Sequence, residues 1–413
     1  MAKFFYIVRD STGKKNTGFE EGSTIEEIVS RLQAKDLIVI DVSVDKGQIE
    51  GAGQDGSSTI KRGRSRLRHR GISGNDLVLF CRQLATLLGA GVTILKSLEI
   101  IALQVSSSKF YMVINELQKN MEAGLSLHEA MSKHPDVFSE LWVNLCESGE
   151  ASGNLAVVLS RLATYLERSA EFKRKLISAV IYPVILFVAG GGAMLFLTLK
   201  IIPTFADLFK GFNITLPVLT QILIGFSNFL KHFFVIIIAS IVVAVVAIKK
   251  YINTKNGRRN LENFQLRLPI FGELFRALSI ERFSSEMSTL VESGVPILYS
   301  LEIAEHSVGN TIMADIIRQI KEDVREGKPL NQPLAKSGFF EPMVVQMITI
   351  GEEIGELSPM FKKINVFYQE YVETFMTRFA TIFEPIMLII IGGMIGVIVI
   401  GMFLPIFEIS QIK

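Results

Sequence analysis

The residues of this chain that could do chemistry are few, and two glutamates stand out among them. Each belongs to a Gly-Glu-x-x-Gly-x-Leu motif, built from Gly149, Glu150 and Gly153 in one place and from Gly351, Glu352 and Gly355 in the other. A carboxylate in such a position can bind a cation, or it can accept hydrogen bonds from the free N–H groups at the start of a helix. We interpret both glutamates as helix caps and keep cation binding as the alternative.

The sequence lacks the common motifs of nucleotide and metal chemistry. Residues 13–18 include two lysines but not the Gly-x-x-x-x-Gly-Lys-Ser/Thr order of a phosphate-binding loop. His128 and His134 have no cysteine partner at zinc-binding spacing. Cys81 and Cys146 are interpreted as reduced, buried residues. We therefore expect neither a metal nor a cofactor, and we predict that the chain is not an enzyme.

Motifs of the N-terminal half recur in the C-terminal half, which predicts a duplicated domain. Residues 80–100 return as residues 283–303, a shift of 203, with 11 of 21 positions identical. From Glu150 and Glu352 onward the shift is 202. This period is far longer than the 20–50 residues of solenoid repeats. We expect two copies of one domain, with the one-residue difference in the loop near residues 134–138.

Three apolar runs are candidates for membrane-spanning helices. Residues 176–199 and 385–407 carry no charged side chain over 24 and 23 positions, and about 20 apolar residues suffice to cross a bilayer. The run at 233–248 has 16 residues. It reaches the needed length when Phe229 and Leu230 join it and Lys231 extends to the interface. A buried core helix is the alternative for this run, but the run has no polar face.

The distribution of lysine and arginine predicts the orientation of the spans. Residues 173–175 are Lys-Arg-Lys before the first run, and Lys249, Lys250, Arg258 and Arg259 follow the second. The connection between these runs is poorer in lysine. By the positive-inside rule both copies are cytoplasmic, and the connection and the C-terminus lie outside. The middle span is then the return path that the duplication requires.

Outside the spans the sequence predicts helices, except at its start. Residues 3–9, 15–20 and 37–44 are typical of strands, and residues 23–26 form a capping box that opens a helix. The expected fold is mainly α: an integral membrane protein with two duplicated cytoplasmic helical bundles, three transmembrane helices and a small N-terminal ββαβ unit. The expected divisions are the ββαβ unit at 1–50, a flexible basic linker at 51–70, bundle one at 71–175, the first span at 176–202, an external loop at 203–228, the second span at 229–248, bundle two at 249–379, the third span at 380–407 and an external tail at 408–413.

The basic linker is the most charged part of the chain. Residues 61–70 read Lys-Arg-Gly-Arg-Ser-Arg-Leu-Arg-His-Arg after a glycine- and serine-rich stretch. Such a run can bind anionic lipid headgroups, or it can be a solvated linker. Nucleic acid is not expected as a partner, because no DNA-binding motif or aromatic platform accompanies the run.

Glycine and proline punctuate both copies at matching places. Gly91 and Gly294 stand where helices should end, and so do Gly149, Gly153, Gly351 and Gly355 of the two glutamate motifs. We interpret these six glycines as turn positions that need a positive φ, with a partner-binding role as the alternative. Small residues and prolines in the first and third spans predict close helix packing and bends. They are Pro183, Gly190, Gly191 and Pro203 in the first span, and Pro385, Gly392, Gly393, Gly396 and Pro405 in the third.

With these motifs in view, the chain resembles the inner-membrane platform proteins of type II secretion systems and type IV pili. The first span fits the signature of that family at Lys175, Leu176, Ala179, Val180, Tyr182, Pro183, Leu186, Gly190, Leu197, Ile201, Ile202 and Pro203. The likeness covers about residues 70–413, and residues 4–14 resemble an N-terminal extension found in many members. The third span departs from the pattern, since Glu384 stands where the first span has tyrosine.

The resemblance implies a non-catalytic scaffold in the inner membrane. Its partners would be a hexameric cytoplasmic assembly ATPase, pilin or pseudopilin subunits and other inner-membrane assembly proteins, and it would be a homo-oligomer. A membrane transporter or channel component is the alternative. No carboxylate or arginine stands at mid-depth in the predicted spans, where ion and proton pathways usually place them, and this argues against that alternative.

Overall fold

The computed structural model describes residues 2–9, 15–22, 25–35, 38–44, 71–210 and 216–411. The chain divides into two compact units, Met1–Arg62 and Gly63–Lys413. The predicted basic linker at 51–70 lies outside the described residues.

The first unit combines a three-stranded antiparallel sheet with one helix. Its elements are β1 (Ala2–Arg9), β2 (Lys15–Gly22), α1 (Ile25–Gln33) and β3 (Ile38–Val44), and the strand order is β2-β1-β3. Ile28 and Leu32, one helical turn apart in α1, are buried together with Val8 of β1. This spacing places both side chains on the helix face that covers the sheet.

The second unit begins with a bundle of short helices. They are α2 (Gly74–Gly89), α3 (Ile94–Ala102), α4 (Ser108–Glu122), α5 (Leu127–Ser132) and α6 (Glu140–Ala151). Hydroxyl side chains start the first four: Ser73, Thr93, Ser107 and Ser126 each accept a hydrogen bond from a backbone N–H of the first turn. Such caps satisfy N–H groups that have no partner inside the helix.

A second bundle repeats this order after the middle span. It contains α10 (Lys255–Arg267), α11 (Phe271–Glu292), α12 (Ile297–Ser307), α13 (Thr311–Arg325), α14 (Asn331–Lys336) and α15 (Pro342–Ile354). The two cores share an aromatic contact. The Phe80 and Phe138 ring centroids are 6.0 Å apart, and those of their counterparts Phe283 and Phe340 are 5.6 Å apart.

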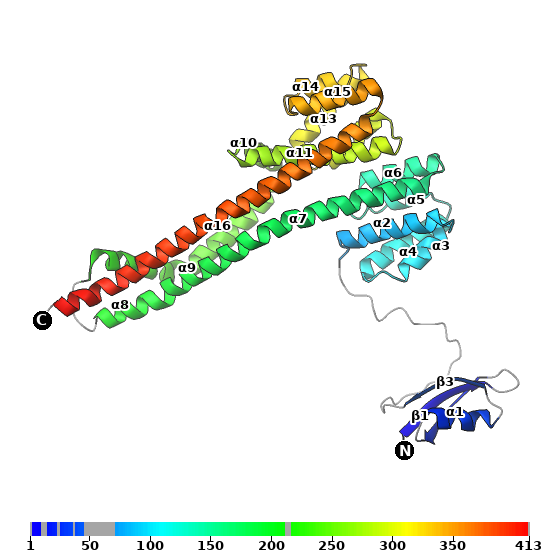
Figure 1. Ribbon diagram of the computed structural model, residues 1–413, viewed down its shortest axis with the longest axis horizontal. Coiled ribbons are helices and arrows are strands. Elements are labelled where there is room, and N and C mark those ends of the chain that lie inside the picture. Colours follow the sequence, from blue (N-terminus) through cyan, green and yellow to red (C-terminus); the bar gives the residue numbers. More distant parts are fainter. Residues whose placement is uncertain are drawn as a thin grey trace. The chain divides into compact units, whose positions relative to one another are not determined.

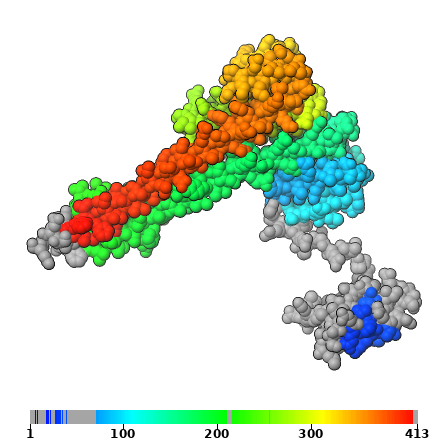
Figure 2. Space-filling model, viewed as in Figure 1, coloured from blue at the N-terminus to red at the C-terminus, as the bar shows by residue number. Residues whose placement is uncertain are grey.

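Each bundle continues into a long helix. In the first copy this helix is α7 (Leu155–Phe196), which has 42 residues without a break and enters the first span. The final helix, α16 (Leu357–Gln411), has 55 residues. The two helices lie side by side, with both bundles at one end of the pair (Figures 1 and 2).

Three stretches of helix in the described chain are long and apolar enough to cross a membrane, as predicted. They are Leu155–Phe209, Val218–Ile252 and Leu357–Phe407, with mean hydropathies of 2.2, 2.6 and 2.8 in their most apolar windows. The first comprises α7, a π-helical turn η2 (Leu197–Ile201) and all but the last residue of α8 (Ile202–Lys210). The second is α9 (Val218–Ile252).

The segment 203–228, expected to be a loop, is largely helical. It contains most of α8 and the first third of α9, so only a short connection separates them. Polar side chains of α9 explain this extension, because they find partners on the neighbouring helices. The Thr220 hydroxyl donates to the Gly401 carbonyl, and the Ser227 hydroxyl donates to the Thr198 carbonyl.

Candidate functional site

Glu150 lies near the C-terminal end of α6, and its side chain binds the first turn of α5. One carboxylate oxygen accepts the backbone N–H of Leu127 at 2.7 Å, and the other accepts that of His128 at 3.2 Å. The second oxygen also lies 2.6 Å from Nδ1 of His128. The carboxylate thus satisfies two first-turn N–H groups of a short helix that has few bonds of its own.

Glu352 makes the same contact in the second copy. Its oxygens accept the backbone N–H groups of Leu330 at 2.8 Å and Asn331 at 3.4 Å, at the start of α14. The capping interpretation therefore describes both glutamates, although the helix that each caps precedes it by more than 20 residues. Among the described residues, no group of three or more His, Cys, Asp or Glu side chains is arranged to hold a metal ion.

The paired caps also locate the length difference between the copies. The donors Leu127 and Leu330 are 203 positions apart, whereas the acceptors Glu150 and Glu352 are 202 apart. The extra position therefore lies between the short helix and the capping glutamate, a stretch that includes the predicted loop at residues 134–138.

Four of the predicted turn glycines have left-handed backbones. The φ angles are +82° at Gly91 and +81° at Gly294, and they are +71° at Gly153 and +79° at Gly355. Side chains other than glycine are disfavoured in this region because their Cβ atoms crowd the backbone. These glycines follow α2, α11, α6 and α15, so equivalent helices of the two copies end in the same way.

The turn interpretation is wrong for Gly149 and Gly351, which lie inside α6 and α15. Both are buried because the next long helix crosses closely over them. A Cβ atom at Gly149 would come within 3.1 Å of the Leu155 backbone, and one at Gly351 within 2.9 Å of the Met360 side chain. Glycine is needed here for close approach of two helices, and the adjacent glutamate is thereby held against its target helix.

The glycines of the spans divide into packed and open positions. A Cβ at Gly190 would overlap Ile391 of α16, so this glycine lets α7 and α16 approach closely. By contrast, a Cβ at Gly191, Gly392, Gly393 or Gly396 would meet nothing within 4 Å. These four glycines are not used for packing within the described chain.

The prolines of the spans lie inside continuous helices. Pro183 belongs to α7, Pro203 to α8, and Pro385 and Pro405 to α16. Next to Pro183 and Pro385, the first and third spans contact each other through the preceding residues, at which the two copies differ. The Tyr182 hydroxyl donates to Oε1 of Glu384 at 2.8 Å, which connects equivalent positions of the two copies.

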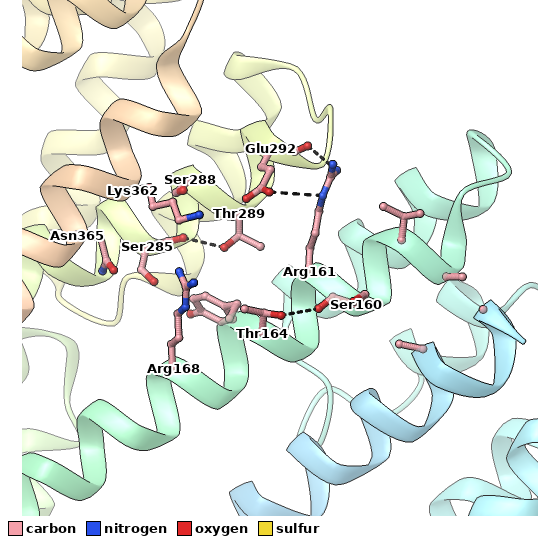
Figure 3. Close-up of a pocket in the computed structure, with 15 residues that line it drawn as sticks. Ser160, Arg161, Thr164, Arg168, Ser285, Ser288, Thr289, Glu292, Lys362 and Asn365 are labelled. Carbon is pink, nitrogen blue, oxygen red and sulfur yellow. Dashed lines mark hydrogen bonds and ion pairs between the residues drawn. The ribbon is translucent and has the colours of Figure 1, made fainter.

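A polar cavity of about 450 Å³ lies between the copies, lined mainly by α7, α11 and α16. Figure 3 shows Arg161 of the first copy reaching to Glu292 of the second. Its guanidinium donates to the Glu292 carbonyl at 2.5 Å, and its Nε lies 3.8 Å from Oε1. A second link joins the Tyr299 hydroxyl to Oδ1 of Asn144 at 2.6 Å. The copies are therefore held together in part by polar contacts, next to an open polar space.

Sequence reasoning missed a set of buried charges. Among the described residues, the buried charged side chains all belong to the second copy: Glu262, Glu281, Glu286, Glu305, Lys321 and Asp323. Comparison of the two copies could have pointed to these residues, because Val78 and Gln83 of the first copy occupy the places of Glu281 and Glu286.

Two of these glutamates lie in α11 with altered acidity. Burial raises the pKa of Glu281. The side-chain amides of Gln369 and Asn365 donate hydrogen bonds to its carboxylate at 2.8 and 3.0 Å, and these lower the pKa by less than burial raises it. Burial likewise raises the pKa of Glu286, although Arg282 approaches it at 3.3 Å. Desolvation disfavours the charged form more than these partners favour it.

Comparison with known proteins places the chain in a family. The sequence model of the family described as type II secretion system (T2SS), protein F matches residues 80–203 and 283–405, one stretch in each copy. A type IV pilus assembly protein PilC of Thermus thermophilus is 36% identical over 410 residues, 99% of this chain and 98% of that protein. A type II secretion system protein F of Pseudomonas aeruginosa is 31% identical over 412 residues, covering both chains completely. The chain therefore belongs to the type II secretion system protein F family, and it is a multi-pass membrane protein with two copies of that family's domain.

Proposed function

We propose that this protein is the non-catalytic inner-membrane platform of a type II secretion or type IV pilus machine. It would couple a hexameric cytoplasmic assembly ATPase to the extraction of pilin-like subunits from the membrane into a filament. The relatives support a role in such a machine, since they are named as pilus assembly and type II secretion proteins. We expect it to act as a homo-oligomer with other inner-membrane assembly proteins.

The observation that carries this proposal is the continuity of α7 and α16. At 1.5 Å per residue, helices of 42 and 55 residues are about 63 and 83 Å long. Each leads from a bundle core into an apolar span without a break. A force applied to a bundle would therefore reach the membrane segment through an unbroken helix, as a mechanical adaptor requires.

The proposed orientation places residues 1–170 and 250–380 in the cytoplasm, where an ATPase can reach both bundles. It rests on the lysines and arginines that border the spans. Reporter fusions after residue 215 and at the C-terminus should both report the outside. A C-terminus that reports the cytoplasm would contradict a topology with three spans.

The open glycines offer a place for the apolar helix of a filament subunit. Small residues let helices approach closely in lipid, and Gly392 and Gly393 meet no neighbour within 4 Å. A photo-crosslinker at Gly392 should trap a pilin-like subunit. The matched control is a crosslinker at Gly190, which faces Ile391 of the same chain and should give mainly internal products.

ATP turnover tests the coupling itself. The full-length protein in lipid nanodiscs should hydrolyse no ATP alone, because its sequence lacks a phosphate-binding loop. Added to the purified assembly ATPase, it should change the turnover rate, whereas empty nanodiscs should not. Turnover that is identical with the protein and with empty nanodiscs would argue against contact with the motor.

A further inference from the structure

The turn between α10 and α11 contains the most unusual backbone of the described chain. Ile270 has φ +70° and ψ −53°, and it is the only residue other than glycine with a positive φ among those described. A β-branched side chain is strongly disfavoured there. Its side chain is 70% exposed, so no packing inside the described chain compensates for the strain.

The backbone around Ile270 is fixed by its neighbours. The Phe271 N–H donates to the Pro269 carbonyl, and the Gly272 N–H donates to the Leu268 carbonyl, both at 2.8 Å. Gly272 lies so close to the Leu266 carbonyl that it has no room for a Cβ. The fold thus imposes a left-handed residue, for which glycine would be the relaxed choice. An exposed isoleucine at this place suggests that its side chain has a contact outside the chain.

The next residue locates the turn relative to the membrane. The Phe271 ring lies 5.5 Å from the ring of Phe379 on α16. Phe379 precedes Pro385, the first residue of the charge-free run, by six positions, or about 9 Å along the helix. The headgroup layers of a bilayer are about 5–7 Å thick on each side of the hydrocarbon. A span that enters the hydrocarbon at Pro385 would therefore place Phe379, and with it this turn, next to the outer edge of the headgroup layer.

The surroundings of Ile270 suit such a boundary. Phe264, in α10, is also exposed, at 62%. Leu274 and Leu278 of α11 line an apolar groove that continues onto Ile177 and Val180 at the start of the first span. This groove extends the apolar surface of the spans onto the second bundle.

Cations border the same region. Lys249 and Lys250 lie in the last turn of α9, Arg267 ends α10, and Arg378 lies on α16 next to Phe379. Arg267 and Arg378 are exposed. Basic side chains beside exposed apolar ones are typical of segments that lie in the interface of an anionic membrane.

We propose that the α10–α11 turn is an interfacial membrane anchor. Ile270 and Phe264 enter the headgroup region of the leaflet that faces the bundles, and Arg267 and Arg378 contact the phosphates of anionic lipids. The second bundle is then held against the bilayer at a point separate from the spans. This inference rests on the three spans and not on coupling to an ATPase.

Quenching of a single tryptophan by brominated lipid tests the anchor. In a Trp142→Phe background, which removes the one native tryptophan, Ile270→Trp is reconstituted in vesicles of brominated phosphatidylcholine and phosphatidylglycerol. Val235→Trp on α9 is the positive control, since Val235 is 75% exposed on a span. Ile354→Trp is the matched negative control, because Ile354 is 66% exposed but precedes α16, far from the charge-free run.

Bromine should quench the fluorescence of the Ile270→Trp variant to an extent that approaches the Val235→Trp variant, and it should leave the Ile354→Trp variant unchanged. Equal behaviour of Ile270→Trp and Ile354→Trp would overturn the anchor. Blue-shifted emission from Ile270→Trp without bromine quenching would also overturn it, because a protein surface and not lipid would then cover the turn. If Ile270→Trp fails to fold, a nitroxide on Ile270→Cys gives the same test, with greater accessibility to oxygen than to a water-soluble nickel complex as the supporting result.

Discussion

The two copies share their turns, an aromatic contact and a carboxylate cap, but they differ in what their cores bury. Counterparts of the second copy's charged residues are neutral in the first: Ala102 stands for Glu305, Gln118 for Lys321 and Asn120 for Asp323. In the second copy, Lys321 lies 2.8 Å from Glu305, and Lys328 lies 2.6 Å from Asp323.

The difference distinguishes contacts that the fold requires in both copies from buried charges that are found in the second copy alone among the described residues. The shared contacts are those that fix helix ends and helix crossings. Buried ion pairs are weak evidence for stability, because desolvation of both charges offsets their attraction. We therefore expect the shared contacts to matter equally in both copies, and the buried glutamates to give the second copy a dependence on pH that they cannot give the first.

The largest effect should come from the shared aromatic contact. Phe80→Ala and Phe283→Ala each remove a buried ring, and each should destabilise its own copy by about 3–5 kcal/mol. Hydrogen exchange resolved by peptide measures this loss copy by copy in the full-length protein. Exposed Leu103 provides the control, since Leu103→Ala should change exchange little. A large loss from only one of the two ring deletions would break the equivalence of the cores.

The capping glutamates should come next. Glu150→Ala and Glu352→Ala each leave two backbone N–H groups without their acceptor, at a cost of about 1.5–3 kcal/mol for hydrogen bonds to a charged group. Exchange should accelerate at the start of α5 or α14, respectively. Glu353→Ala is the matched control, because Glu353 is exposed beside Glu352. Protection that survives both alanine variants would refute the caps.

Smaller losses are expected at the left-handed turns. Gly91→Val and Gly294→Val should each cost about 1–2 kcal/mol, since a side chain is disfavoured in this backbone region. Gly89→Ala, at the helical end of α2 where nothing lies within 4 Å of a Cβ, should be close to neutral. Thermal unfolding of the variants, compared with the parent protein, gives the answer. Near-neutral valine variants would be inconsistent with the turn geometry.

The smallest effect should be the dependence on pH that Glu286 gives the second copy. The pKa of Glu286 is raised above its ordinary value of 4.5. Between pH 4.5 and the raised pKa, the folded state therefore keeps a proton that the unfolded state has released. This contribution is complete below pH 4.5 and is lost as the pH rises through the raised pKa. Glu286→Gln, the residue of the first copy, should flatten the fall in protection of α11 over this range. An identical pH profile for the variant and the parent would exclude Glu286 as its source.

Much of this architecture could be predicted from the sequence because it depends on local patterns. The charge-free runs predicted the three spans, and the motif that recurs at Phe80 and Phe283 predicted the duplication. The capped helices could not be found, because Glu150 and Glu352 each act on a helix more than 20 residues away. Gly149 and Gly351 were misinterpreted because close helix packing and a left-handed turn both require glycine, and the sequence alone does not distinguish the two.

The buried charges and the strained turn lie beyond what one sequence reveals. Nothing near Glu286 in the sequence indicates that α11 is covered on nearly every side, and a hydrophobic pattern cannot show this. Ile270 follows a proline in a short linker, and its positive φ accompanies the close approach of Gly272 to the Leu266 carbonyl. Both features depend on contacts between helices.

Filament output in cells is the most direct test of the proposed platform role. The gene for this chain is deleted while the assembly ATPase and the filament subunits remain at normal levels, and surface filaments or secreted substrate are then counted. We predict that output is abolished and that the intact gene restores it. Normal filament assembly or secretion in the deletion strain would contradict the platform role.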